Sequence, residues 1–294
     1  MTRQLRDRLS AVGMGSAALF CVALAASIAV ALVLRSRPML AESSVTRLLT
    51  SSSWRPLAGE FGFFPFIVGT LCVSGLAMAL GIPVCLLSSL YLTEYAHSHL
   101  RSVARPVLDL LAAIPPVVFG LWGVLALVPL VQKLGARFGS ATTGYSVLAG
   151  GIVLAIMVFP IIIAVMQEVL LKVPLEAREA SLALGATRWQ TTKHVVVRAA
   201  YPGIIAAIVL GFSRALGETM AVLMVVGNVP TVPRSVFDPA YPLPALIANN
   251  YGEMMSIPRY DSALMFAALI LMALVLIFNI GAIVALRGIE RKLA

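Results

Sequence analysis

Six long apolar runs constrain this chain more than any other feature of its sequence. They cover residues 11–34, 63–90, 107–131, 145–170, 203–226 and 263–286. Each exceeds the roughly 20 residues that an α-helix needs to cross the hydrocarbon core of a bilayer. In lipid the backbone must satisfy its own hydrogen bonds, so helices are the structure expected for such runs. The sequence therefore predicts an all-α membrane protein with six transmembrane helices.

The composition supports this prediction and excludes several other classes of protein. Hydrophobic residues make up 60% of the 294 residues, charged residues make up 12%, and the mean hydropathy is +0.96. Soluble domains carry about 25% charged residues, so a soluble enzyme, a disordered chain and a collagen-like chain are excluded. The net charge is +9, but the basic residues lie in short segments beside the apolar runs. That placement predicts membrane lipid, and no nucleic acid, as the partner of these charges.

The basic residues also predict the orientation of the chain in the membrane. Arg3, Arg6 and Arg8 precede the first run, which is longer than the about 7–15 apolar residues of a cleaved signal peptide, so we expect a retained helix. With the N-terminus inside, thirteen of the 22 Lys and Arg residues lie in inner segments and eight in outer ones, while Arg214 lies within the fifth run. Because inner segments are usually the more basic ones, both termini are predicted to be cytoplasmic.

Two further expectations concern the domains and the shape of the helices. We expect residues 1–62 to hold an N-terminal tail, the first helix and an external connection, and residues 63–294 to form a core of five helices. Pro115 and Pro116 fall inside the third run, and Pro160 falls inside the fourth. A proline inside a helix removes a backbone hydrogen bond, so we predict kinks, rather than breaks, at these prolines.

The longest inner segment, residues 171–202, is too polar to cross the membrane and too patterned for a simple spacer. Glu179-Ala180-Ser181 and the apolar residues 182–184 lead to Gly185, and a second stretch of mixed charge follows. This pattern predicts a helix, a turn and a second helix. Such a rigid element suits docking against a soluble partner protein, whereas a solvated connector between spans has the same polarity. The pattern alone leaves both alternatives open.

Two opposite charges, Arg214 and Glu218, lie inside the fifth run, four residues apart. On a continuous helix this spacing places both side chains on one face. A charge near the bilayer centre costs about 2.5–3.5 kcal/mol, so we expect both to face the bundle interior or a watery cavity. Either Arg214 donates to an oxyanion in transit while Glu218 holds it in place, or the two form a structural ion pair. Ala207, Gly211 and Ala215 recur at a spacing of four and predict close approach of another helix.

The sequence contains no further pattern that carries chemistry. Cys21, Cys72 and Cys85 lie in apolar runs, where buried thiols are expected, and no Cys/His cluster has the spacing of a zinc site. The chain lacks the GxxxxGK[ST] loop that holds nucleotide phosphates. We therefore expect no ATPase activity, no metal and no cofactor in this chain. An intramembrane enzyme would need a nucleophile with a base, or a metal site, and neither is visible.

Several of these segments resemble a known family of transport proteins. Glu179-Ala180-Ser181, with Gly185 and Pro202-Gly203, resembles the EAA loop of ABC-importer permeases. The string from Arg214 to Val222, Arg-Ala-Leu-Gly-Glu-Thr-Met-Ala-Val, is similar to the permease subunits of phosphate-specific importers. Residues 69–71, 91–96, 112–115, 236–239 and 243–248 add to the resemblance, which extends from about Trp54 to the C-terminus.

The resemblance implies a fold, a function and a set of partners. It implies a type I ABC-importer permease (MetI-like) core in the last five helices, and ATP-driven import of inorganic phosphate across the cell membrane. The partners implied are a second homologous permease subunit (PstA-like), a cytoplasmic ABC ATPase dimer and an external phosphate-binding protein. The binding protein would dock at an outer mouth formed by residues 228–261 and other outer loops. The residues implied are Arg214, Glu218, Ser213 and Thr219 for the substrate pathway, and Glu179, Ala180 and Gly185 for coupling to the ATPase.

Two other functions stay open at this point. Sulfate and molybdate overlap with phosphate in size and charge, so the chain is also compatible with a permease for another tetrahedral oxyanion. A membrane scaffold that reports phosphate status to a sensor is the second alternative, and it is compatible with transport.

Overall fold

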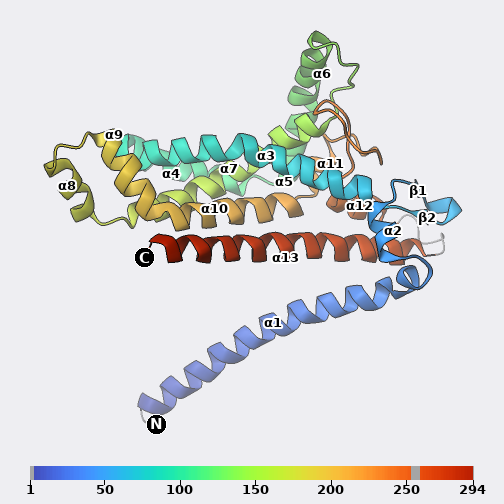
Figure 1. The fold of residues 1–294 in the computed structure, drawn as a ribbon, viewed down its shortest axis with the longest axis horizontal. Helices are drawn as coiled ribbons and strands as arrows, with labels where there is room; N and C mark the ends of the chain where they lie inside the picture. The colour runs from blue at the N-terminus through green and yellow to red at the C-terminus, as the bar shows by residue number, and fades with distance from the viewer. Residues whose placement is uncertain (1–2, 253–258, 294) are drawn as a thin grey trace.

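A computed structural model describes residues 3–252 and 259–293 of the chain, and within them it is mostly helical (Figure 1). Six of its helices are long and apolar enough to cross a membrane. They cover Ser10–Glu42, Phe64–Tyr95, Pro116–Arg137, Val147–Leu171, Arg188–Gly217 and Tyr260–Gly288. The predicted fold class, an all-α membrane protein with six transmembrane helices, is confirmed.

Long helices are separated by short elements that cap or redirect them. The long helices are α1 (Arg3–Glu42), α3 (Phe64–Leu90), α7 (Val147–Leu171), α10 (Val197–Gly217) and α13 (Tyr260–Leu293). The short helices are α2 (Val45–Thr50), α4 (Ser98–Ala113), α5 (Pro116–Trp122), α6 (Val128–Arg137), α8 (Leu175–Ala183), α9 (Arg188–Thr191), α11 (Met220–Leu223) and α12 (Leu243–Asn250). The described residues also form three π-helical segments: η2 (Tyr91–Tyr95), η3 (Gly123–Leu127) and η4 (Thr192–Val196). They further form one 3₁₀ turn, η1 (Pro56–Ala58), and two short strands, β1 (Trp54–Arg55) and β2 (Glu60–Phe61).

Helix α7 is the central element of the bundle. It packs against α3 and α10, and its side chains Leu154, Ile162 and Met166 are almost fully buried. Two glycines on neighbouring faces of α7 show how closely α3 approaches: a Cβ on Gly151 would overlap Leu76, and one on Gly150 would contact Val73. Lipid is as apolar as these side chains, so burying them gives little hydrophobic gain. The stability of the α3–α7 contact therefore depends on close van der Waals packing.

An aromatic cluster closes the end of the bundle that carries β1 and β2. The antiparallel pair places Trp54 opposite Phe61, and the Trp54 ring lies 4.8 Å from the ring of Phe66 on α3. Tyr260, at the start of α13, is also buried in this cluster, 6.2 Å from Trp54. The cluster therefore joins the connection after α1 to the first turns of α3 and α13.

Among its described residues, helix α1 is buried against the rest of the chain near its C-terminal end, at Ser36 and Met39. It lies against the start of α13 and then diverges from the bundle toward its N-terminus (Figure 1). Ion pairs join Arg35 to Asp261, at 4.0 Å, and Glu42 to Arg259. The most apolar part of α1 is entirely unburied by this chain.

The third predicted span, residues 107–131, is wrong in its position. Helix α4 ends at Ala113, and Ile114 and Pro115 adopt extended backbone with ψ of 127° and 141°. A proline disfavours the helical region for the residue before it, and here two successive prolines act on Ile114 and Pro115. The prolines therefore break the run, and the span begins at Pro116. Pro160, in contrast, lies within unbroken α7.

The fifth predicted span, residues 203–226, is wrong in its position: the observed span, Arg188–Gly217, begins and ends earlier in the chain. The helix begins at Arg188, continues through η4 into α10 and ends at Gly217, so that Pro202 lies inside it. Residues 218 and 219 connect it to the separate short helix α11. The apolar run identified only the part of the chain that lipid tolerates. The helix also includes the more polar residues 188–200 that precede this run.

The two ends of the bundle carry different elements (Figure 1). The start of α1, the α8–α9 segment and the end of α13 lie at one end of the bundle, and β1, β2 and α12 lie at the other. An even number of crossings places both ends of a chain on the same side of a membrane, which is compatible with this arrangement.

The small-residue row on α10 gives a test of helix packing. Gly211 is buried, and a Cβ there would overlap Ile162 of α7, so Gly211→Val should overpack the interface and destabilise the protein by about 1–3 kcal/mol. Gly75→Val is the control, because the space around Gly75 on α3 is open. Thermal unfolding in detergent should show a lower melting temperature for Gly211→Val alone. Equal melting temperatures in the two variants would contradict close α7–α10 contact.

Candidate functional site

The helix–turn–helix predicted for the inner segment is present. Helix α8 follows the extended Pro174, and the chain reverses at Gly185, whose φ is +83°. This left-handed conformation is one that glycine adopts without steric cost. The turn closes through a bond from the Gly185 N–H to the Leu182 carbonyl, at 2.9 Å. Gly185 is therefore required for the shape of the turn, as the sequence predicted.

Local hydrogen bonds fix the second helix of this element. Thr187 and Gln190 form a capping box: each side chain accepts a bond from the other residue's backbone N–H, at 3.3 and 2.8 Å. The Ser181 and Thr191 hydroxyls lie 2.9 Å apart and join α8 to α9. The element is thus a defined two-helix unit, which we call the α8–α9 hairpin (Leu175–Thr191).

The α8–α9 hairpin presents an apolar outer surface at the end of the bundle. Leu184 is 89% exposed, and Leu175, Leu182 and Trp189 are also exposed. Glu179 and Ala180, two of the residues predicted for coupling, are exposed on the same short helix. Figure 1 shows the hairpin projecting beyond the ends of α3 and α10. Several large apolar side chains exposed on one short element are typical of a protein-docking site.

A charged contact on the inner side of the hairpin was not anticipated from the sequence. The Arg178 guanidinium lies 3.0 Å from Glu94 Oε1 and donates to the Leu170 carbonyl at 2.8 Å. Both charged side chains are mostly buried, 17% exposed for Arg178 and 10% for Glu94. Arg178 thus ties α8 to the end of α7 and to η2. No local spacing could have revealed a pair whose members lie so far apart in the sequence.

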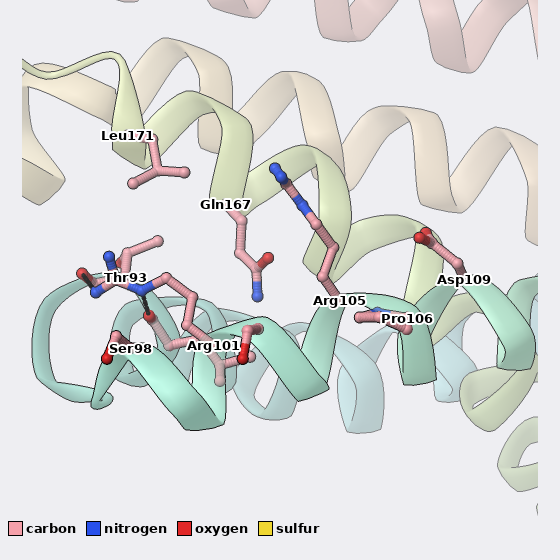
Figure 2. A pocket seen from close by; sticks show the side chains of 10 residues that line it. Thr93, Ser98, Arg101, Arg105, Pro106, Asp109, Gln167 and Leu171 are labelled. Carbon is pink, nitrogen blue, oxygen red and sulfur yellow. Dashed lines mark hydrogen bonds between the residues drawn. The ribbon is translucent and has the colours of Figure 1, made fainter.

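A groove of about 460 Å³ lies beside η2, between α4 and the end of α7. Figure 2 shows its polar lining, which includes Ser98, Arg101, Arg105, Asp109 and Gln167. The Arg101 side chain turns back toward η2 and donates to the carbonyls of Leu92 and Thr93, at 3.0 and 2.8 Å. Arg101 therefore binds two backbone carbonyls of the π-helical segment.

The expectation that Arg214 and Glu218 share a helical face is wrong. Helix α10 ends at Gly217, and Glu218 has an extended backbone with ψ of 128°. Arg214 is exposed in the last turn, and among the ion pairs of the described residues none joins it to Glu218. The half-buried Glu218 carboxylate instead accepts from the Ala221 N–H, at 3.3 Å, at the start of α11. The helix break separates the two charges.

The residues that flank this pair also differ in surroundings. Ser213 donates to Asn279 on α13, at 2.8 Å, and to the Val209 carbonyl, at 2.9 Å, so its hydroxyl joins two helices. Thr219 is half-buried and its hydroxyl lies 3.4 Å from the Gly217 carbonyl. The freed Ala215 carbonyl accepts from the Glu218 N–H and from the Ser74 hydroxyl. Protein groups thus satisfy the backbone at the break after Gly217. The Arg214 side chain lies beside this break and is exposed.

No candidate metal centre was found among residues 3–252 and 259–293. No group of three or more His, Cys, Asp or Glu side chains in these ranges could hold a metal ion.

Comparison with known proteins identifies the family. A model of the binding-protein-dependent transport system inner membrane component matches residues 81–293. The probable ABC transporter permease protein YqgH of Bacillus subtilis is 41% identical over 71% of this chain and 67% of its own length. The phosphate transport system permease proteins PstC of Pasteurella multocida and Xylella fastidiosa are 35% and 34% identical, over 83% and 82% of this chain and 80% and 79% of their own lengths.

Solved structures agree on the fold. A bacterial alginate ABC transporter, solved with its alginate-bound periplasmic protein, matches with a TM-score of 0.65 at 16% identity, over 94% of this chain and 93% of the other. The MetNI methionine ABC transporter matches with a TM-score of 0.54 at 21% identity, over 77% of this chain and 94% of the other. The chain therefore belongs to the binding-protein-dependent transport system inner membrane components, the membrane permeases of ABC importers.

Proposed function

We propose that this chain is the transmembrane permease subunit of an ATP-driven importer of inorganic phosphate. The observation that carries the proposal is the set of relatives named phosphate transport system permease protein PstC, which align with about four fifths of the chain. The string from Arg214 to Val222 supports it, since an exposed arginine beside a helix break suits an oxyanion.

The proposed assembly contains three further kinds of protein. The chain lacks a nucleotide-binding loop, so a cytoplasmic ABC ATPase dimer supplies the energy, docked on the exposed surface of the α8–α9 hairpin. An external phosphate-binding protein delivers the ion to the outer mouth, residues 228–261, of which residues 253–258 lie outside the described residues. A second, PstA-like permease completes the pathway.

The need for a second permease follows from Arg214. Its side chain is exposed on the isolated chain although the helix carrying it is apolar enough to cross the membrane. An arginine facing lipid costs about 2.5–3.5 kcal/mol or more, whereas one facing a water-filled pathway between two subunits does not. We therefore assign Arg214 to the substrate pathway. Glu218 and Thr219 lie beside it at the break, where Glu218 orders α11 rather than orienting Arg214.

The same proposal covers location and domain organisation. We place the protein in the cell membrane with both termini and the α8–α9 hairpin in the cytoplasm, in agreement with the bias of basic residues. We also retain the division into residues 1–62 and a permease core of residues 63–294, since the family model lies entirely within the second part.

The substrate is tested by uptake of labelled phosphate in cells with and without the chain. Phosphate should enter only cells that have the chain, and excess unlabelled phosphate, but not sulfate or molybdate, should compete. Stronger competition by sulfate or molybdate would contradict the proposed substrate and favour another tetrahedral oxyanion.

Replacement of Arg214 tests its place in the pathway. Arg214→Gln should abolish uptake at unchanged abundance, because a neutral amide lacks the charged, forked donors of a guanidinium, and Arg214→Lys should retain part of it. The control is Arg287→Gln, which removes another exposed arginine from a long helix. Normal uptake by Arg214→Gln would exclude Arg214 from the pathway.

Replacement of Gly185 tests the docking surface. Gly185→Val forces a branched side chain into positive φ at a cost of about 1–3 kcal/mol, so the hairpin should tilt and co-purification of the ATPase should fall, with uptake falling in parallel. Gly139→Val is the matched control, because Gly139 has a φ of +72° and open space around it but follows α6. The docking role is disproved if both variants retain the ATPase equally.

A further inference from the structure

Three arginines from three different elements converge on the π-helical segment η2. Arg101 of α4 donates to the carbonyls of Leu92 and Thr93. Arg178 of α8 pairs with Glu94 at 3.0 Å. Arg188, at the start of α9, lies over the Tyr95 ring, 5.4 Å from its centroid. Two of these arginines belong to the α8–α9 hairpin, so that hairpin holds η2 from one side while α4 holds it from the other.

Because of the position of η2 in the chain, these contacts link α4, α8 and α9 to α3. The segment continues α3 without a break, and α3 packs along α7 in the core. The polypeptide itself connects α8 directly to α7 and α9, whereas α8 reaches α3 through side chains at η2. A π-helical turn interrupts the regular hydrogen-bond ladder and is often found at functional sites. The segment is therefore the continuation of α3 on which the contacts from α8 and α4 act.

The Glu94–Arg178 pair is close but incompletely satisfied. Arg178 Nε is buried and has no hydrogen-bond partner among the described residues, and the buried Glu94 Oε1 contacts Arg178 as an ion pair at 3.0 Å without hydrogen-bond geometry. Charges so far removed from water interact strongly, and breaking such a pair is more costly than breaking an exposed one. The pair therefore links the position of α8 directly to that of η2.

We propose that Glu94 and Arg178 are positioning residues that transmit movement of the α8–α9 hairpin to α3 through η2. The inference rests on the proposed function, because it assumes that an ATPase moves the hairpin. In this arrangement the ATPase contacts the outer surface of the hairpin, and Arg178 carries the displacement to Glu94 on its inner side. Helix α3 then moves with α8 as a unit, and the core contacts of α3 pass the movement into the bundle.

The first test measures transmission without reference to the substrate. Spin labels are placed at Ala183 of α8 and at Leu87 of α3, both exposed, in the complete transporter. The distance between the labels should stay constant between the nucleotide-free and ATP-bound states, since the two elements move together. In the Glu94→Gln variant ATP should change this distance. The same response in wild type and variant would overturn the proposal.

The second test measures energy coupling in proteoliposomes that contain the complete transporter. Site-to-site coupling typically corresponds to about 5- to 150-fold effects, so Glu94→Gln should lower phosphate imported per ATP hydrolysed by about tenfold while the ATPase remains bound. The control is Glu168→Gln, which removes an exposed carboxylate from α7, outside both η2 and the α8–α9 hairpin. A fall in uptake and hydrolysis together, at a constant ratio, would indicate a merely structural role and overturn the proposal.

Three further variants, Arg178→Gln, the double variant and Glu94→Asp, separate transmission through the pair from misfolding. Arg178→Gln combined with Glu94→Gln should lower the ratio no more than either change alone, because one pair is lost in all three; additive losses would contradict transmission through the pair. Glu94→Asp keeps the charge and should fall between wild type and Glu94→Gln. If wild type imports no phosphate, the proposed function fails, but the spin-label distances still decide the inference.

Discussion

The need to satisfy every backbone hydrogen bond within lipid governs the whole structure. In the hydrocarbon core an N–H or carbonyl group has no water to bond, so every interruption of a helix must be covered by protein groups. Two stretches of irregular backbone that pack against α3 illustrate this rule. At the end of α10 the Ala215 carbonyl is bonded by the Ser74 hydroxyl, and at the start of α12 the Leu243 N–H is bonded by the buried Thr70 hydroxyl. The polar side chains of α3 thus allow irregular backbone beside the candidate pathway.

The number of spans was predictable from the sequence because hydropathy measures what lipid tolerates, and six apolar runs give six spans. Their boundaries were not predictable in the same way. A run of apolar residues does not reveal that Ile114 and Pro115 must leave the helical region, which moved the third span to Pro116. It also does not reveal how far a helix extends into water, which displaced the fifth span.

The two candidate sites differ in how well local pattern described them. The α8–α9 hairpin was predicted correctly because Gly185 and the residues beside it act locally, through a turn and a capping box. The face shared by Arg214 and Glu218 was predicted wrongly because the argument assumed a continuous helix, and the helix ends between them at Gly217. The Glu94–Arg178 pair was missed, because tertiary packing alone brings η2 and α8 together.

The local origin of the α8–α9 hairpin has a consequence for assembly. Its turn, its capping box and the Ser181–Thr191 bond are all made within the hairpin itself, so its shape does not depend on a bound partner. A segment that is already ordered loses little conformational entropy on association, and more of the contact energy of its exposed leucines and Trp189 is retained as affinity. The hairpin therefore presents a preformed surface, and docking on it needs no rearrangement of its backbone.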